Sequence, residues 1–242
     1  MIAAKPSTRA SANIPDALHR LGSPDSTLSG SKISSSIHVV KTGHVNPVNI
    51  PREWVTMHRS CRMSMRQQIQ MEVNASLQYL AMGAYFSKDV VNRPGFAKLF
   101  FDAASEEREH AMKLIEYLLM RGELTSDVTT LLQVRVRGDH TPERKIWEGG
   151  IDALEHALRM ESEVTKSIRN VIKACEEDSE FNDYHLVDYL TGDFLEEQYK
   201  GQRDIAGKAS QLKKLMERHA SLGEFIFDKK LLGLASSSCL VV

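Results

Sequence analysis

The chain has 242 residues, of which 42% are hydrophobic and 26% are charged, and its formal net charge at pH 7 is −1. A chain of this length can bury one sizeable core or at most two small ones. The near-zero net charge gives no field that favours nucleic acid or an anionic membrane, and no apolar run reaches the roughly 18 residues of a membrane span. We therefore expect a globular protein with neither nucleic acid nor a membrane as its partner.

Residues 1–45 are rich in serine and follow neither a helical nor a strand period, so we expect a disordered extension. They lack the apolar core of roughly 7–15 residues that a secretory signal peptide contains. A plain tail, an alternative first exon and an organelle transit peptide are the three readings of this segment. Arg9 and the many serines favour transit, whereas Asp16 and Asp25 argue against it.

Helical periodicity begins soon after residue 46 and continues, with interruptions, to residue 234, which bounds the expected domain. The turn-forming run Asn92-Arg-Pro-Gly ends the first pattern, and Pro94 is well placed as an early residue of the next helix. The expected elements are helices at residues 53–87, 94–120, 145–175, 184–219 and 222–232, a long connection at 123–145, a polar turn at 176–183 and a tail at 235–242.

The connection over residues 123–145 is too long for a turn between two neighbouring helices. A connection of this length inside a compact domain usually crosses from one end of the fold to the other. Four long helices with one such crossover predict an all-α four-helix bundle, to which residues 222–232 add a short fifth helix.

The apolar stripe of the second helix contains two residues with metal-binding side chains. It runs Phe100, Ala103, Glu107, His110, Leu114, in alternating steps of three and four residues. Because residues i and i+3 lie on one helix face, Glu107 and His110 can reach the same ion. A buried charge without a partner is costly, so we expect either an opposite charge or a metal beside them.

Each of the other three long helices also places one polar group in its apolar stripe, namely Glu72, Glu161 and Gln198. A single buried glutamate is more often half of an ion pair, and a single histidine is more often a hydrogen-bonded core residue. Groups from four helices at mid-length instead match the oxygen donors and one nitrogen that a pair of iron or manganese ions needs. Only one Glu-x-x-His motif is present and Gln198 is a neutral amide, so we expect the second metal to be held more weakly.

The segments that carry these groups, residues 68–80, 106–111 and 193–198, resemble ferritin and, within that family, its catalytic heavy subunit. The similarity extends over residues 51–234, and segments 79–96 and 184–192 are most similar to the secreted heavy chain of insects. The resemblance implies a ferritin-like bundle that assembles with other ferritin subunits, of its own kind or of the light type, into a hollow octahedral cage.

The resemblance also implies which residues bind two irons per subunit. Glu72, Glu107 and His110 match the ligands of the first iron. Glu107 would bridge to a second iron, which Glu161 also holds, with Gln198 nearby. The implied substrates are ferrous iron and dioxygen, and the implied product is ferric oxyhydroxide stored in the cage, so the chain would be a ferroxidase. Two rivals are a structural cage subunit without oxidase activity and a di-iron oxygenase that acts on an organic substrate.

Further residues have less specific expectations. Tyr79 matches a tyrosine beside the iron pair in the family, and it can equally be a core aromatic with a hydrogen-bonded hydroxyl group. Carboxylates on the flank of the second helix would collect ferric ions for mineral growth or form a solvated acidic face; they are Asp102, Glu106 and Glu109. At the threefold channel this chain has Asp188 followed by Thr191 instead of glutamate, with Asp193 close by.

Cys61 lies near the start of the first helix and Cys175 at the end of the third, so an up, down, down, up bundle brings them to one end. A disulfide is then geometrically allowed, and two free thiols are the alternative. The resemblance to a secreted chain favours the disulfide and the secretory pathway, whereas the lack of a visible signal peptide favours the cytoplasm.

Overall fold

The computed structural model describes residues 56–123, 144–176 and 182–233, and every regular element within these ranges is helical. The expected extension at 1–45, the tail at 235–242, most of the crossover and most of the polar turn at 176–183 lie outside the described residues. The elements are α1 (Arg59–Phe86), α2 (Pro94–Met120), α4 (Gly150–Glu176), α5 (Tyr184–Tyr189), the π-helical turn η2 (Leu190–Phe194), α6 (Leu195–His219) and α7 (Ser221–Leu231).

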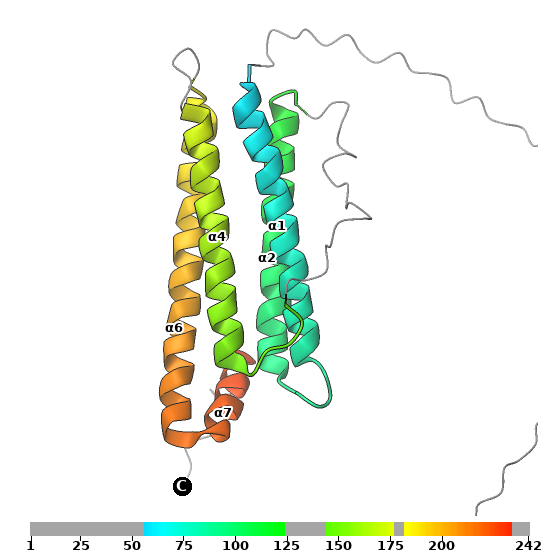
Figure 1. Cartoon of the computed structure of the whole chain (residues 1–242), viewed down its shortest axis with the longest axis vertical. Coiled ribbons are helices and arrows are strands. Elements are labelled where there is room, and N and C mark those ends of the chain that lie inside the picture. Colours follow the sequence, from blue (N-terminus) through cyan, green and yellow to red (C-terminus); the bar gives the residue numbers. More distant parts are fainter. Residues whose placement is uncertain (1–55, 124–143, 177–181, 234–242) are drawn as a thin grey trace, which may run out of the picture. The chain divides into compact units, whose positions relative to one another are not determined.

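Four long helices lie side by side, as Figure 1 shows: α1 packs along α2 and α4, and α4 packs along α6. The short helix α7 packs against α6 and α2. The predicted four-helix bundle with a short fifth helix is thus confirmed. An ion pair between Arg62 and Glu123 places the end of α2 beside the start of α1. A hydrogen bond from the Tyr85 hydroxyl to the Trp147 carbonyl places the approach to α4 beside the end of α1, so Glu123 and Trp147 lie at opposite ends of α1.

Two apolar clusters fill the bundle on either side of its middle. The first lies near the start of α1 and includes Met65, Ile69, Leu114, Leu118 and Ile168. The second lies near the end of α1 and is rich in aromatic side chains, including Tyr79, Phe86, Phe96, Phe100 and Trp147. The predicted polar groups Glu72, Glu107, His110, Glu161 and Gln198 are buried near the middle of the bundle.

A disulfide joins Cys61 near the start of α1 to Cys175 near the end of α4, with 2.09 Å between the two sulfur atoms. The two Cα atoms are 4.7 Å apart, and both residues are buried. The ends of α1 and α4 are therefore linked covalently at the apolar cluster that contains Met65 and Ile168.

Two predicted helix starts were wrong, whereas both ends of α2 were confirmed. Residues 56–58 are not helical, so α1 begins at Arg59 and not at residue 53. The third long helix begins at Gly150 and not at residue 145. Side-chain contacts hold the segment before it: Trp147 is buried and its indole N–H donates to His156, while Arg144 pairs with Asp152.

The fourth long helix was predicted as one continuous helix over residues 184–219, and its two ends were confirmed. The structure divides it by the π-helical turn η2, which contains one extra residue per turn and changes which side chains face inward. Helical spacing in the sequence predicts that Gly201 on this helix and Leu80 on α1 face inward, but Gly201 is exposed and Leu80 is 45% exposed.

The helix α7 supplies hydrogen-bond acceptors to the first turns of two other helices. Asp228 is fully buried, and its Oδ1 accepts hydrogen bonds from the backbone N–H groups of Gly95 (2.8 Å) and Phe96 (3.1 Å) in α2. Glu224 accepts a hydrogen bond from the N–H of Gly150 at the start of α4 and pairs with Arg93. These carboxylates satisfy donors that a helix leaves unpaired at its N-terminus, and their charge suits the positive end of the helix dipole.

Candidate metal centre

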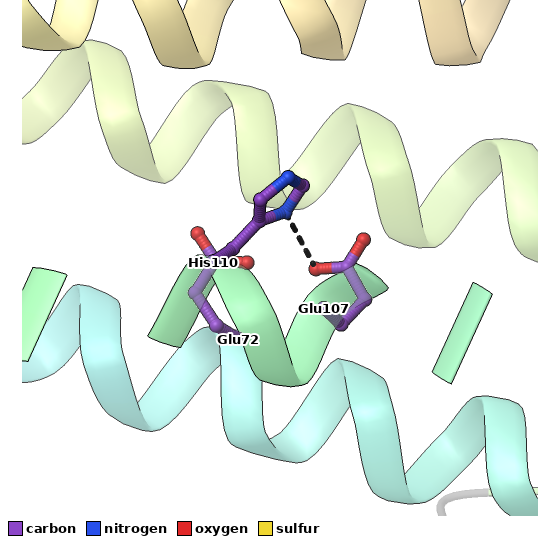
Figure 2. Close-up of side chains that lie close together, drawn as sticks. All are labelled: Glu72, Glu107 and His110. Carbon is purple, nitrogen blue, oxygen red and sulfur yellow. Dashed lines mark ion pairs between the residues drawn. The ribbon is translucent and has the colours of Figure 1, made fainter. Parts of the chain in front are cut away.

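The centre begins at the contact between α1 and α2, at the middle of the bundle. Ser76, one turn after Glu72, donates a hydrogen bond of 2.7 Å to the carbonyl of Ala104, one turn before Glu107. This bond ties the two helices together at the level of the predicted ligands. Figure 2 shows Glu72 on α1 and Glu107 with His110 on α2, their side chains directed toward one another.

One ligand atom from each of Glu72, Glu107 and His110 lies within 4.8 Å of the others, and all three residues are buried. Glu72 Oε2, Glu107 Oε2 and His110 Nδ1 have no hydrogen-bond partner among the described residues. Leaving three such atoms unpaired in an apolar interior is costly, and a metal ion bound by all three would offset that cost. The donor set of two carboxylates and one imidazole suits a divalent ion such as ferrous iron.

The same burial changes the pKa values of the acidic groups. Loss of water raises the pKa of Glu72 well above its ordinary value, and the neighbouring Glu107 carboxyl group adds to the shift. Burial raises the pKa of Glu107 to about 8, with the nearby negative charge of Glu161 as the second cause. The pKa of Glu161 is also raised by burial. Burial thus favours the protonated form of each acid, and a metal ion that binds there must displace any such proton.

Glu161 and Tyr79 extend the centre toward α4. The Tyr79 hydroxyl donates a hydrogen bond of 2.5 Å to Glu161 Oε1, and the ring of Tyr79 is 1% exposed. Burial, followed by the negative charge of Glu161, raises the pKa of Tyr79 well above its ordinary value. The pKa of Glu107 responds to both Glu72 and Glu161, so its carboxyl group lies near the acid of α4 as well as near the first group of ligands.

Gln198 on α6 completes the set of polar groups predicted to converge, but its amide oxygen is already engaged. Thr165 donates a hydrogen bond of 2.9 Å to Gln198 Oε1, and the Gln202 amide donates in turn to Thr165. The Gln198 side chain also hydrogen bonds with Glu161, which lowers the pKa of that acid against the larger effect of burial. Gln198 therefore interacts with Thr165 through its amide oxygen and also affects the pKa of Glu161.

Sequence reasoning missed three residues that contact the predicted ligands. Gln68 donates a hydrogen bond of 2.7 Å to Glu72 Oε1, and Thr165 binds Gln198 as described. Glu197 Oε2 lies 3.1 Å from His110 Nε2. Gln68 stands four residues before Glu72, and a polar residue at that spacing was a signal that the sequence offered. No spacing relates Glu197 to His110, because the two residues come from different helices.

A cavity of about 150 Å³ adjoins the centre and extends between α2 and α6. Tyr79, Glu107, His110, Glu161 and Gln198 contribute to its wall. The exposed acids that line it are Asp102, Glu106, Glu197 and Asp204. A space of this size accommodates ions together with several waters.

The remaining predicted acids lie apart from this cavity. Glu109 is exposed on α2 and does not line it. Asp188 on α5 and Asp193 in η2 are also exposed and also lie outside the cavity wall. The structure thus brings two of the three predicted mineral-binding acids, Asp102 and Glu106, to the mouth of the centre, while Asp102 also pairs with Lys98.

Comparison with known proteins agrees with this arrangement. Residues 64–224 match the model of the ferritin-like domain family. The ferritin heavy chain of Trichoplusia ni is 83% identical over 191 residues, which are 79% of this chain and 88% of that protein. The ferritin heavy chain of Papilio xuthus is 76% identical over 194 residues, which are 80% of this chain and 90% of that protein.

A crystal structure of Trichoplusia ni secreted ferritin superimposes with a TM-score of 0.75 at 83% identity and covers 79% of this chain and 97% of that one. Among the helices that the structure describes, none is long and apolar enough to cross a membrane. The family match, the heavy-chain relatives and the buried carboxylate–histidine cluster lead to one conclusion: this chain belongs to the ferritin family of iron-storage proteins, among its heavy chains.

Proposed function

We propose that the chain is a ferroxidase, which oxidises two ferrous ions with dioxygen and passes the ferric product to a mineral stored inside a ferritin cage. The observation that carries the proposal is the buried group of Glu72, Glu107 and His110, whose facing atoms have no hydrogen-bond partner among the described residues. Purely structural buried charges are normally paired, so this arrangement is better explained by a cation. A structural cage subunit without oxidase activity has no need of such a cluster.

Each residue of the centre has a defined task in this reaction. Glu72 and His110 bind the first ferrous ion, and Glu107 lies between them and Glu161, where its two oxygens can serve both ions. Tyr79 orients the Glu161 carboxylate through its short hydrogen bond. Binding of the ions displaces protons from the buried carboxyl groups, whose anionic form stabilises Fe³⁺ more than Fe²⁺. One electron leaves each iron, and dioxygen receives both.

We further propose that the protein acts as an oligomer of ferritin subunits, either of its own kind or with light-type chains, since cage formation is the property of its family. Asp102 and Glu106 lie at the mouth of the cavity and would collect ferric ions there, with Glu109 further along α2. Asp188 and Asp193 are exposed, as channel residues between subunits must be.

A secretory location is proposed on two grounds. The disulfide between Cys61 and Cys175 is of a kind that persists in oxidising compartments and is rare in the cytosol. The Trichoplusia ni relative whose crystal structure superimposes on this chain is a secreted ferritin.

Stopped-flow mixing of the assembled, metal-free protein with ferrous iron in air tests the ferroxidase proposal. We expect rapid oxidation by the wild type and, for Glu107→Ala, a rate no faster than that of protein-free buffer. Glu116→Ala is the matched control, because it removes an exposed carboxylate from the same helix. Size-exclusion chromatography must show that all three proteins assemble alike.

Two outcomes would overturn the assignment. Wild-type oxidation no faster than buffer would leave the structural cage subunit as the function. An assembled Glu107→Ala variant that retained the wild-type rate would show that oxidation occurs at another place. A di-iron oxygenase remains the second alternative, and consumption of dioxygen that depended on an added organic substrate would support it.

A further inference from the structure

We propose that Glu197 is a positioning residue that fixes the His110 imidazole for metal binding. Glu197 is on α6, whereas His110 is on α2, and the Glu197 Oε2 to His110 Nε2 distance of 3.1 Å is a hydrogen bond. A carboxylate oxygen accepts hydrogen bonds, so the imidazole carries its hydrogen on Nε2 and donates it to Glu197. A neutral imidazole has one such hydrogen, and His110 Nδ1 is therefore left with a free lone pair.

That lone pair is directed toward the other ligands. His110 Nδ1 is buried, lacks a hydrogen-bond partner among the described residues and lies 3.7 Å from Glu107 Oε2. The reverse tautomer would place a hydrogen on Nδ1, where it would block access of a cation to this nitrogen. Glu197 thus selects the form of the imidazole that can bind a metal, and it never touches the ion itself.

The surroundings hold both members of this pair in place. The ring of Phe194, from the π-helical turn η2, packs beside the His110 ring with 5.6 Å between centroids. Lys113 Nζ approaches Glu197 Oε2 to 3.5 Å and helps to keep that carboxylate directed toward His110. Two residues from the region of the fourth long helix, Phe194 and Glu197, therefore contact the His110 ring.

A different reading treats Glu197 only as one of several surface charges that attract cations. The Glu197 side chain is 46% exposed and stands on the cavity wall with Asp102, Glu106 and Asp204. The two readings differ in what they require. A hydrogen bond to His110 needs an acceptor atom at this position, whereas attraction of cations needs a negative charge, and salt screens it.

Calorimetric titration of the metal-free, assembled full-length protein with Zn²⁺ separates these readings. Zinc binds imidazole and carboxylate without redox chemistry, and loss of its tightest site in Glu107→Ala identifies the centre. We expect Glu197→Ala to weaken that site about 10–100-fold, the usual effect of removing a carboxylate that orients a ligating histidine. Glu197→Gln, whose amide oxygen can still accept, should weaken it less. Glu196→Ala removes the neighbouring exposed carboxylate, which pairs with Lys200, and should leave the affinity unchanged.

Repetition in about 1 M salt, where the screening length falls to about 3 Å, completes the test. The proposal requires the loss in Glu197→Ala to persist there. It is overturned if Glu197→Ala binds zinc as the wild type does. The proposal is also overturned if Glu197→Gln and Glu197→Ala lose zinc affinity equally and neither variant differs from the wild type in high salt. The negative charge of Glu197 alone would then explain the loss.

This inference rests on the proposed role of His110 as a metal ligand, and the measurements keep the two proposals apart. Zinc titration does not depend on iron oxidation. A wild type that failed to oxidise iron would refute the ferroxidase function, and the zinc affinities of the Glu197 variants would still test the role of Glu197. Normal iron oxidation, together with a zinc affinity that is indifferent to Glu197, would refute this inference alone.

Discussion

Three buried carboxyl groups, from Glu72, Glu107 and Glu161, meet within the centre, and burial raises the pKa of each. Burial favours their protonated forms when no cation is bound, and metal binding would replace those protons with the positive charge of the ion. The residues that decide the chemistry are therefore the ones that cost stability when no metal is bound.

The first prediction concerns the stability of the metal-free protein against pH. A carboxyl group whose folded pKa is raised binds more protons in the folded than in the unfolded state, so stability falls as pH rises through the interval between the two pKa values. For Glu107 that interval runs from 4.5 to about 8. Denaturant unfolding in the presence of a chelator should therefore show lower stability at about pH 8 than at about pH 6.

The Glu107→Gln variant is the control for this effect. It stays neutral at every pH, so its stability should decline less over the same interval, by a difference on the order of a few kcal/mol. An equal decline in the variant and the wild type would mean that Glu107 titrates normally.

A second prediction at this scale concerns unequal metal sites. In the proposed centre the second ion would be held by Glu161 and Glu107 alone, because the oxygen of Gln198 accepts a hydrogen bond from Thr165. Anaerobic titration with ferrous iron should show one tight and one weaker site per subunit. Gln198→Glu adds a charged ligand of the same size and should reduce the difference in iron affinity between the two sites. Two sites of equal affinity in the wild type would contradict this asymmetry.

At the scale of elements, α7 caps the helices α2 and α4. Asp228 satisfies two N–H groups of α2, which has no side-chain cap of its own at Arg93, and Glu224 binds the first N–H of α4. Since α2 carries Glu107 and α4 carries Glu161, this short helix fixes the starts of two helices that form the centre.

The third prediction follows from that capping. Asp228→Ala leaves two buried N–H groups without an acceptor and should lower the free energy of unfolding by roughly 2–3 kcal/mol. Asp228→Asn retains an acceptor oxygen and should lose less. Denaturant unfolding measures both variants, and equal stability of Asp228→Ala and the wild type would show that α7 does not stabilise the bundle through this contact.

At the scale of the whole molecule, the disulfide between Cys61 and Cys175 joins residues 114 positions apart in the sequence. Both cysteines are buried, so an alkylating reagent added to the native protein cannot distinguish a disulfide from two free thiols. Closing a loop of this length stabilises a fold by about 4–5 kcal/mol in the chain-entropy model.

The fourth prediction is that the natural protein contains this bond. Peptide mapping after unfolding and alkylation without a reductant should yield one linked peptide with Cys61 and Cys175. The same sample treated with a reductant first should yield two separate alkylated peptides. Complete alkylation of both cysteines in the unreduced sample would show that the disulfide is absent. The main structural support for a secretory location would then be lost as well.

The sequence by itself determined the bundle and singled out the buried polar residues that form the candidate metal centre. Alternation of three and four residues is imposed by the helix period, so a charged group such as Glu107, His110 or Glu161 in an apolar stripe can be recognised without a structure. Both ends of α2 followed from local signals as well, since Pro94 favours the first turn of a helix and Gly122 has the positive φ of a residue that ends one.

The tertiary structure alone decided which groups meet across helices. The start of α4 at Gly150 depends on Glu224, which lies in α7. The π-helical turn carries Phe194 to the ring of His110, and Glu197 reaches that same ring from the next turn. Such contacts depend on how two helices pack and are rotated against each other, which is set by the fit of whole apolar faces. A periodic pattern in one segment contains no information about that fit.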